Sequence, residues 1–572
     1  MPQSRVPWLT WILAVLAGIV SYLAFRPSGW WFAAPVAMAL LYVALRPLGP
    51  WRGQPVAAVF GLAQFLPMLT WAYNAAGLLP YLALALASAL MLSLGAVVYG
   101  YGRYLLGARP APRPRGSRGG RGGKVSAVRP RFTASVPDAV LFALAFTGSD
   151  TLRQFFPFDG FPWGRLGFTQ VDGPMAGWAW LGGVTLVGLA AALAGALSVV
   201  ALLTVVTPPA VPGGPSGSGP LGGSGAATAV KRNWRRVGLA AGLTAGVVAL
   251  PLIFPISNKA QAGTLTVGAV QGDVQVTSEG LFAQQREVLE NHAKVSLELA
   301  HSAGQGKLDL VLWPENSTDI DPRTDLEAYD TIDSAASALG APVLVGAMEY
   351  VNSSNRYNQG LLWRAGEGVV DVYAKRHPAP FAEYMPARSF FRLFTKKVDL
   401  INTDMLPGDK VGLMPFEAGV LGRKVALGDI ICFEVAYDSI VADVVQAGAE
   451  MIVVQTNNAS FGFSEESTQQ FAMTRLRAIE HGRATVQIST VGVSAAVAPD
   501  GSLLTPVTSL YEPAYFTADL PLRTSLTPAT RIGDLVCWAM MVAPVALAVA
   551  GLGARFAHGR RPVVRRGKGV RA

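Results

Sequence analysis

The stretch Gly428-Asp429-Ile430-Ile431-Cys432-Phe433-Glu434 decides the fold of the water-facing part of this 572-residue chain. It continues a β-branched run that starts at Val425, and such a run predicts a buried strand ending at Ile431. A helix-compatible segment begins near Val435, so Cys432 stands at a strand-to-helix turn. A thiol at such a turn is exposed beside the positive end of a helix dipole, which favours a thiolate. The stretch predicts an α/β domain with Cys432 as candidate nucleophile, with a buried structural cysteine as the plainer alternative.

Composition divides the rest of the chain. The mean hydropathy is +0.36 and only 15% of the residues are charged, which is typical of chains with many membrane spans. The acidic residues are very unevenly placed, since 32 of the 37 lie between Thr264 and Arg523. We therefore expect a membrane domain, then a soluble domain, then a membrane tail.

Eight apolar segments are candidate membrane spans. They lie at 7–25, 28–45, two within 53–102, 136–155, 176–206, 237–256 and 534–553. The predicted domains are an N-terminal membrane domain at 1–260 with about seven helices, a catalytic domain at 261–525, a C-terminal helix at 533–554 and a basic tail at 555–572. Basic cytoplasmic loops are expected at 107–133 and 208–236.

The basic residues fix an orientation. With a cytoplasmic N-terminus, eight spans place the basic loops and the basic tail inside, as the positive-inside rule requires. The arm at 156–175 and the soluble domain then lie outside. The net charge of +10 does not indicate nucleic acid, because residues 107–133 carry eight Arg or Lys without interleaved aromatic residues. Cys537 heads the last apolar segment, so we expect no structural disulfide.

The soluble domain alternates predicted strands and helices, which fits an α/β sandwich with helices on its outer faces. Strands are expected at 264–270, 308–313, 342–347, 360–364, 369–374, 425–431, 451–455, 485–489 and 493–498. Helices are expected at 280–303, 326–339 and 466–481. The fold class is thus a multi-span α-helical membrane domain joined to an extracytoplasmic α/β domain.

Three polar residues follow predicted strands: Glu315, Lys375 and Cys432. Because strand ends converge on one edge of a sheet, we expect the three side chains to meet in one cleft. Each alone is more simply explained as a solvated surface residue or a core thiol. Together they supply a general base, a cation for a developing oxyanion and a nucleophile, which suits acyl transfer through a thioester.

The segments around these residues resemble the Glu-Lys-Cys regions of the nitrilase superfamily. They are Leu312-Trp313-Pro314-Glu315, Tyr373-Ala374-Lys375-Arg376-His377 and Asp429-Ile430-Ile431-Cys432-Phe433-Glu434. The following Pro380-Phe381-Ala382-Glu383-Tyr384-Met385-Pro386 and the flanking spans resemble one branch, the bacterial apolipoprotein N-acyltransferases. That resemblance implies an α-β-β-α sandwich in the cytoplasmic membrane, with its catalytic domain on the outer face. It also implies transfer of a fatty acyl chain from a phospholipid donor to a diacylglyceryl-modified apolipoprotein, by a monomer without metal or cofactor.

The resemblance also assigns roles by position. It makes Cys432 the nucleophile, Glu315 the base and Lys375 the oxyanion stabiliser. Glu383 and Glu434 would support the site, although a salt bridge to a surface base explains Glu434 equally well. Phe433 would offer its N–H to the oxyanion hole.

Two features of the sequence depart from the family pattern. Ser460 stands where some members carry Trp, so a lid contact made by that ring is not expected here, and the loop at 107–133 is long and rich in Gly and Arg. The arm containing Phe161-Pro162-Trp163 resembles the family's extracytoplasmic arm. The alternatives to an acyltransferase are a membrane-tethered amidase and a non-catalytic scaffold that binds lipoproteins.

Overall fold

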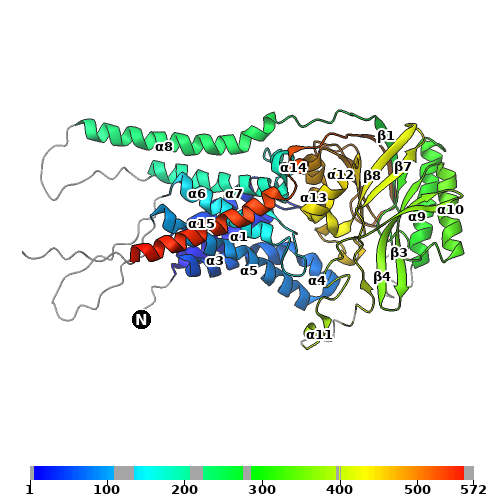
Figure 1. Cartoon of the computed structure of the whole chain (residues 1–572), viewed down its shortest axis with the longest axis horizontal. Coiled ribbons are helices and arrows are strands. Elements are labelled where there is room, and N and C mark those ends of the chain that lie inside the picture. The colour runs from blue at the N-terminus through cyan, green and yellow to red at the C-terminus, as the bar shows by residue number, and fades with distance from the viewer. Residues whose placement is uncertain are drawn as a thin grey trace, which may run out of the picture.

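The computed structural model describes residues 6–107, 134–206, 223–274, 285–393, 399 and 401–559. A helical bundle and an α/β domain lie end to end (Figure 1). The bundle contains α1 (Trp8–Leu23), α2 (Ala33–Leu45), α3 (Pro50–Met68), α4 (Thr70–Ala76), α5 (Leu78–Gly102), α6 (Val136–Leu152), α7 (Trp178–Val206), α8 (Gly223–Ala249) and α15 (Leu535–Gly559). The predicted loop at 108–133, the linker at 207–222 and the tail from 560 fall outside the described residues.

Each of the eight predicted spans contains a helix. Among the described residues, four helices are long and apolar enough to cross a membrane, or five if the bent pair α3 and α4 forms one span. Helices α1 and α2 have only 16 and 13 residues. The eight-span topology therefore stays a prediction.

Helix α8 begins earlier than expected. A linker was predicted as far as Arg236, but the helix starts at Gly223 and includes the basic cluster. The alanines that follow Gly223 are good helix formers, and their propensity outweighed the glycines that suggested a linker.

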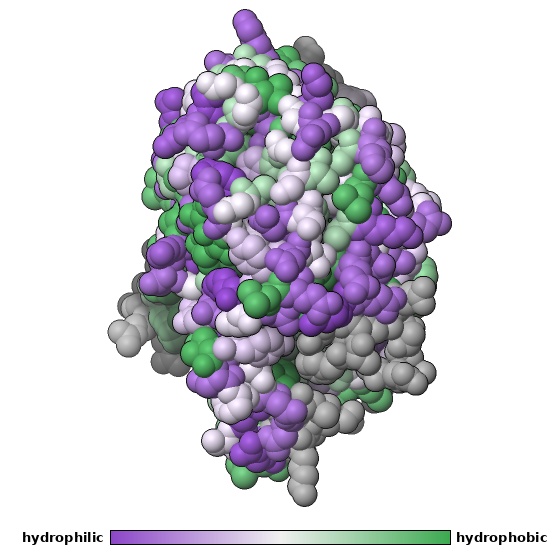
Figure 2. Space-filling view, turned by 90° about the vertical axis from the view of Figure 1, so that its right-hand side faces the viewer, coloured by the Kyte–Doolittle hydropathy of each residue, from purple (hydrophilic) through white to green (hydrophobic). Residues whose placement is uncertain are grey.

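The two ends of the molecule differ in surface chemistry. Helix α5 exposes a column of leucines at helical spacing, Leu79, Leu82, Leu86, Leu90 and Leu94. An apolar stripe of this length is unusual on a surface that faces water. The end of the α/β domain farthest from the bundle is instead largely hydrophilic (Figure 2).

The α/β domain is a sandwich of two sheets, which confirms the predicted α/β sandwich. The first sheet has the order β12-β1-β2-β3-β4-β5, with β6 paired to β4, and the second has the order β11-β10-β9-β8-β7. The first contains β1 (Thr264–Gln271), β2 (Leu310–Leu312), β3 (Val343–Asn352), β4 (Asn355–Arg364), β5 (Gly368–Ala374), β6 (Asp404–Met405) and β12 (Ala514–Pro521). The second contains β7 (Leu413–Ala418), β8 (Arg423–Ile431), β9 (Met451–Thr456), β10 (Ala484–Ser489) and β11 (Ala495–Val497).

Helices cover both outer faces. Helices α9 (Gln285–Ala303) and α10 (Leu326–Leu339) pack on the first sheet, and α12 (Asp438–Gln446) and α13 (Glu466–His481) pack on the second. Apolar side chains from the facing sheets, including Leu312 and Ile431, form the inner core. Strands β7 and β12 were not predicted. Both are edge strands, and Pro415 within β7 is tolerated only at such an edge.

The bundle and the sandwich share one core. Helices α13 and α14 (Pro528–Ile532) contact α7 of the bundle, and one buried cluster includes both Phe142 of α6 and Leu476 of α13. Because α12 and α13 lie between the second sheet and the bundle, the turn that follows β8 faces the bundle (Figure 1).

Candidate active site

The three candidate catalytic side chains come from both sheets. Glu315 lies three residues after β2, and Lys375 directly follows β5, which runs parallel to β2 within the first sheet. Cys432 directly follows β8 of the second sheet. The structure thus brings the three together at one end of the sandwich. The expectation of a single sheet edge was wrong, because β8 belongs to the second sheet whereas β2 and β5 belong to the first.

Lys375 bridges two carboxylates. Its Nζ lies 3.2 Å from Oε1 of Glu315 and 2.6 Å from Oε1 of Glu383, and the lysine side chain is only 1% exposed. Burial alone would lower the pKa of this lysine, but the two carboxylates and Cys432 raise it well above its usual value. Lys375 is therefore a permanent cation in the site. Glu383, the predicted supporting residue, also accepts a hydrogen bond from the backbone N–H of Ala379 at 2.6 Å.

Glu315 is held by donors at both of its oxygens. Oε1 accepts from Nδ2 of Asn358 at 2.7 Å as well as from Lys375, and Oε2 accepts from the backbone N–H of Asn457 at 2.8 Å. Burial and the Glu383 charge raise the pKa of Glu315, while Lys375 and the hydrogen bond from Asn358 lower it in part. A fixed carboxylate with a raised pKa, close enough to the thiol for each to shift the other's pKa, is placed to accept its proton.

Cys432 has an unusual backbone. Its φ of 54° lies in the left-handed region, which costs roughly 1–3 kcal/mol for a residue that is neither Gly nor Asn. Such a sharp turn after a strand presents a nucleophile at the strand end. The thiol is nearly buried at 9% exposure, so the expectation of an exposed side chain was wrong.

The α-helix that was predicted to begin directly after Cys432, with its dipole favouring the thiolate, is also not present there. A 3₁₀ turn occupies Cys432–Ala436, and the α-helix α12 starts only at Asp438. The dipole effect fades within the first turn of a helix, so α12 does little for the thiol. Burial and the nearby Glu315 carboxylate raise the pKa of Cys432 well above its ordinary value, so the resting thiol is protonated.

Glu434 connects the segments that carry Lys375 and Cys432 through buried hydrogen bonds. Its carboxylate is fully buried and accepts hydrogen bonds from the Tyr373 hydroxyl and from the backbone N–H groups of Ile431, Arg376 and His377, at 2.6–3.0 Å. It therefore links the residues just before Cys432 to those just after Lys375. The alternative of a surface salt bridge for Glu434 was wrong, because its oxygens are occupied in the interior.

The arm of the bundle packs on Phe433, the residue after Cys432. The Phe433 ring stacks on Phe161 at 5.6 Å and on Trp163 at 5.7 Å between ring centroids. The Tyr437 hydroxyl donates to the carbonyl of Gly160 at 3.0 Å. The arm that resembled a family feature thus forms one wall beside the Cys432 turn. The oxyanion role of the Phe433 N–H stays a prediction.

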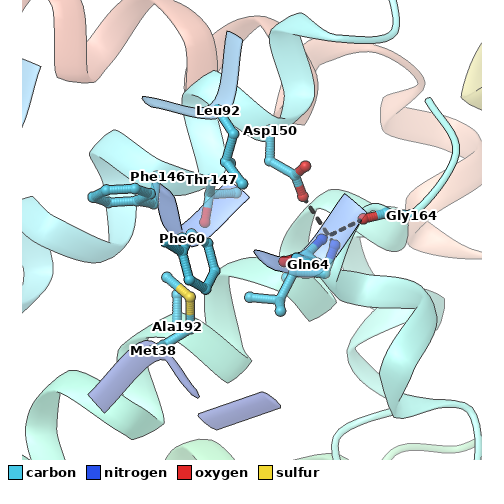
Figure 3. Close-up of a pocket in the computed structure, with 11 residues that line it drawn as sticks. Met38, Phe60, Gln64, Leu92, Phe146, Thr147, Asp150, Gly164 and Ala192 are labelled. Carbon is cyan, nitrogen blue, oxygen red and sulfur yellow. Dashed lines mark hydrogen bonds between the residues drawn. The ribbon is translucent and has the colours of Figure 1, made fainter. Parts of the chain in front are cut away.

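Residues of the bundle also hold this arm in place through hydrogen bonds. Oδ2 of Asp150 accepts from the Leu166 N–H at 2.9 Å, and Nε2 of Gln64 donates to the Gly164 carbonyl at 3.5 Å (Figure 3). A cavity of about 20 Å³ beside them has room for a group the size of one water.

The loop that carries Ser460 also reaches the bundle. The Phe461 ring packs edge-on against Trp71 at 5.1 Å, and Nδ2 of Asn74 donates to the Phe461 carbonyl at 2.9 Å. Phe461, not residue 460, therefore makes the aromatic contact of this loop with α4.

A buried ionic cluster joins the arm to α12 and α13. Asp438 pairs with Arg165 at 2.7 Å and with Arg477 at 2.8 Å, and both cations lower its pKa. Cys537 donates to Oδ2 of Asp438 at 3.3 Å. Arg477 also donates to the carbonyl of Val435, within the 3₁₀ turn that begins at Cys432. No local pattern in the sequence predicts this cluster, because its members are far apart along the chain.

Asn358, Thr456 and Asn457 were also missed as site residues. Thr456 and Asn457 stand at the end of the predicted strand 451–455, so the strand-end rule that found Glu315 could have found them. Asn358 lies inside β4, where the sequence carries no comparable signal.

Comparisons with known proteins follow the same division of the chain. Residues 17–197 match the apolipoprotein N-acyltransferase N-terminal domain, and residues 266–525 match the carbon-nitrogen hydrolase family. The apolipoprotein N-acyltransferase of Mycolicibacterium smegmatis is 32% identical over 557 residues, covering 93% of this chain and 84% of the relative. That of Pseudomonas aeruginosa strain PAO1 is 26% identical, covering 94% and 97%. Among solved structures, an amidase from Nesterenkonia sp. aligns with a TM-score of 0.35 at 16% identity, covering 47% of this chain and 94% of the amidase.

Proposed function

Because the chain belongs to the apolipoprotein N-acyltransferase family, we propose that it moves a fatty acyl chain from a membrane phospholipid to the α-amino group of a lipoprotein's diacylglyceryl-cysteine. The meeting of Glu315, Lys375 and Cys432 at one end of the sandwich carries this proposal. The family membership favours acyl transfer over the membrane-tethered amidase and over the lipoprotein-binding scaffold.

In the first half-reaction, Glu315 takes the proton of the Cys432 thiol, and the thiolate attacks an ester carbonyl of the phospholipid. The Lys375 ammonium and the Phe433 N–H stabilise the oxyanion. The tetrahedral intermediate collapses, and a lysophospholipid leaves with the proton held by Glu315. The products are an acyl thioester on Cys432 and a regenerated Glu315 carboxylate.

In the second half-reaction, Glu315 takes a proton from the incoming α-amine. The amine needs this help because its unperturbed pKa of about 7.7–8.0 leaves it largely protonated at neutral pH. Glu315 releases this proton to the solvent, and the neutral nitrogen attacks the thioester carbonyl. Glu315 then takes a second proton from the nitrogen as the amide forms, and Cys432 leaves as a thiolate that receives this second proton from Glu315. The cleft has to exclude water throughout, because hydrolysis would otherwise waste the thioester.

The function is tested at the lipoprotein itself. We expect mass spectrometry of a lipoprotein N-terminus to show one additional acyl chain, amide-linked, in cells that contain this protein and not in cells that lack it. An N-terminus of equal mass in both cell types would contradict the proposed function.

The location is part of the proposal. We infer that the bundle lies in the cytoplasmic membrane as a monomer, with the catalytic domain on the outer face. The leucine column of α5 supports lipid contact, since apolar side chains at such spacing gain from leaving water. The basic loops support the orientation.

Thiol labelling tests the orientation. In a chain lacking both native cysteines, Lys424→Cys on β8 replaces a side chain that is 75% exposed. Arg52→Cys lies in the first turn of α3, between the second and third predicted spans, and so on the inner side of the eight-span topology. A membrane-impermeant reagent should label Lys424→Cys in intact cells and Arg52→Cys only after permeabilisation. The reverse pattern would put the catalytic domain inside and end the lipoprotein assignment.

A further inference from the structure

Two neutral hydrogen-bond donors contact the Cys432 sulfur. The reaction described above uses neither of them. Oγ1 of Thr456, the last residue of β9, donates toward Sγ at 3.4 Å, and Nε2 of Gln470 in α13 does so at 3.7 Å. Both side chains are fully buried. These distances suit hydrogen bonds to sulfur, which is a larger acceptor than oxygen.

A chain of hydrogen bonds fixes which way the Gln470 amide points. Nδ2 of Asn458 donates to Oε2 of Glu466 at 2.6 Å, and Oδ1 of Asn458 accepts from the Ser489 hydroxyl at 2.6 Å. The same Nδ2 lies 3.1 Å from Oε1 of Gln470. Because an amide nitrogen only donates and its oxygen only accepts, Gln470 must turn its oxygen to Asn458 and its N–H to the sulfur.

The Thr456 hydroxyl has one proton and two acceptors. Oε1 of Gln470 lies 2.9 Å away and Sγ of Cys432 lies 3.4 Å away. When the thiol is neutral, the proton can bond the closer oxygen. When the sulfur becomes an anion, the hydroxyl can rotate toward it, and Oε1 of Gln470 keeps its bond from Asn458. No buried acceptor is left without a partner by this rotation.

We propose that Thr456 and Gln470 are catalytic donors that stabilise the Cys432 thiolate, both when it forms and when it leaves the thioester. This assignment rests on the proposed role of Cys432 as nucleophile. It also explains how a thiolate can form where the helix dipole is absent and the thiol is buried.

The charged groups around the sulfur make neutral donors useful. Glu315, Lys375 and Glu466 act on the thiol, and Glu383 acts through Lys375. The negative charge of Glu315 opposes thiolate formation until that carboxylate accepts the proton. Glu466 is buried, and burial raises its pKa to about 8, so it is mostly neutral at pH 7 and orients Asn458 without adding a full charge. Hydrogen bonds to an anion are about twice as strong as neutral ones, so both donors favour the thiolate over the thiol.

The test measures the thiol itself. In a Cys537→Ala background, Cys432 is the only cysteine, and its alkylation by iodoacetamide is followed as a function of pH. We expect Thr456→Val to raise the apparent pKa of alkylation by about one unit, a ~10-fold slower reaction below that pKa. Thr456→Ser should restore the wild-type profile, because it keeps the hydroxyl. Gln470→Met should raise the pKa by itself, which keeps the proposal testable if Thr456→Val does not fold.

Thr474→Val is the matched control. Thr474 of α13 is buried like Thr456, and its hydroxyl donates to Gln487 at 2.7 Å and to the backbone carbonyl of Gln470 at 3.2 Å rather than to sulfur. The Gln470 side chain keeps its own contacts, so the alkylation profile of Thr474→Val should match wild type. Superimposable profiles for wild type, Thr456→Val and Gln470→Met would overturn the proposal. That result would leave the acyltransferase reaction standing, because alkylation does not depend on turnover, whereas full turnover in Cys432→Ala would remove the reaction itself.

Discussion

Cys432→Ala should abolish acyl transfer, by at least ~10³-fold, while the protein still folds and inserts. No neighbouring side chain can replace the sulfur as the atom that holds the acyl group. Cys432→Ser should be equally inactive, because a hydroxyl lacks the low pKa that lets a thiol form an anion. The measurement is amide formation on a lipopeptide acceptor with purified protein, alongside a thermal unfolding midpoint.

Cys537→Ala is the matched control for this result. Cys537 is the second thiol of the chain and is also buried, but its sulfur bonds Asp438 and Thr185 rather than the catalytic carboxylate. We expect turnover within about two-fold of wild type, because only two weak hydrogen bonds of the sulfur are lost and Asp438 keeps its ion pairs with Arg165 and Arg477. Wild-type rates in Cys432→Ala would instead show that Cys432 is only a buried structural residue.

Glu315→Gln and Lys375→Met should each slow turnover by at least ~10²-fold, the usual scale for a general base or an oxyanion donor. Gln at position 315 keeps the size of the side chain but cannot accept the thiol proton. Lys375→Met removes the oxyanion cation and leaves Glu315 and Glu383 without their shared counter-charge. Rates within about three-fold of wild type in either variant would contradict the assigned roles.

The Lys375 variant should also change the pH profile. The lysine charge lowers the pKa of Glu315, so its removal raises that pKa further above the ordinary value. Glu315 must be ionised to act as a base, so the acidic limb of the residual activity should move to higher pH. Lys424→Met removes an exposed lysine from the same domain and should leave both the rate and the profile unchanged.

Most of the candidate site was predicted from polar residues that closely follow apolar strands. Glu315, Lys375 and Cys432 were found this way, because β2, β5 and β8 have strongly apolar residues that mark where each strand ends. The α-β-β-α sandwich was implied by the family resemblance, but the assignment of each strand to one of the two sheets was not predicted. Sequence order cannot tell whether two strands lie side by side or stack face to face, since both arrangements bury the same apolar residues.

Contacts between distant segments account for the other differences. The Arg165–Asp438 pair and the stacking of Trp163 on Phe433 join residues that are about 270 positions apart. No local pattern encodes such pairs, because their geometry depends on how the bundle docks on α12 and α13. The prediction of a helix dipole at Cys432 was wrong for a related reason. The left-handed backbone of Cys432 leads into a 3₁₀ turn held by Arg477, a contact that no residue near Cys432 reveals.

The central claim is that the acyl chain passes through Cys432, and one measurement tests it most directly. Purified protein is incubated with phospholipid and no acceptor, and both the protein mass and the released lipid are measured. We expect one hydroxylamine-sensitive acyl group on Cys432 and one lysophospholipid per protein, with no further release until an apolipoprotein or a mimetic lipopeptide is added. Continuous release of free fatty acid without acceptor would indicate a hydrolase, and the absence of any adduct on Cys432 would contradict the thioester account.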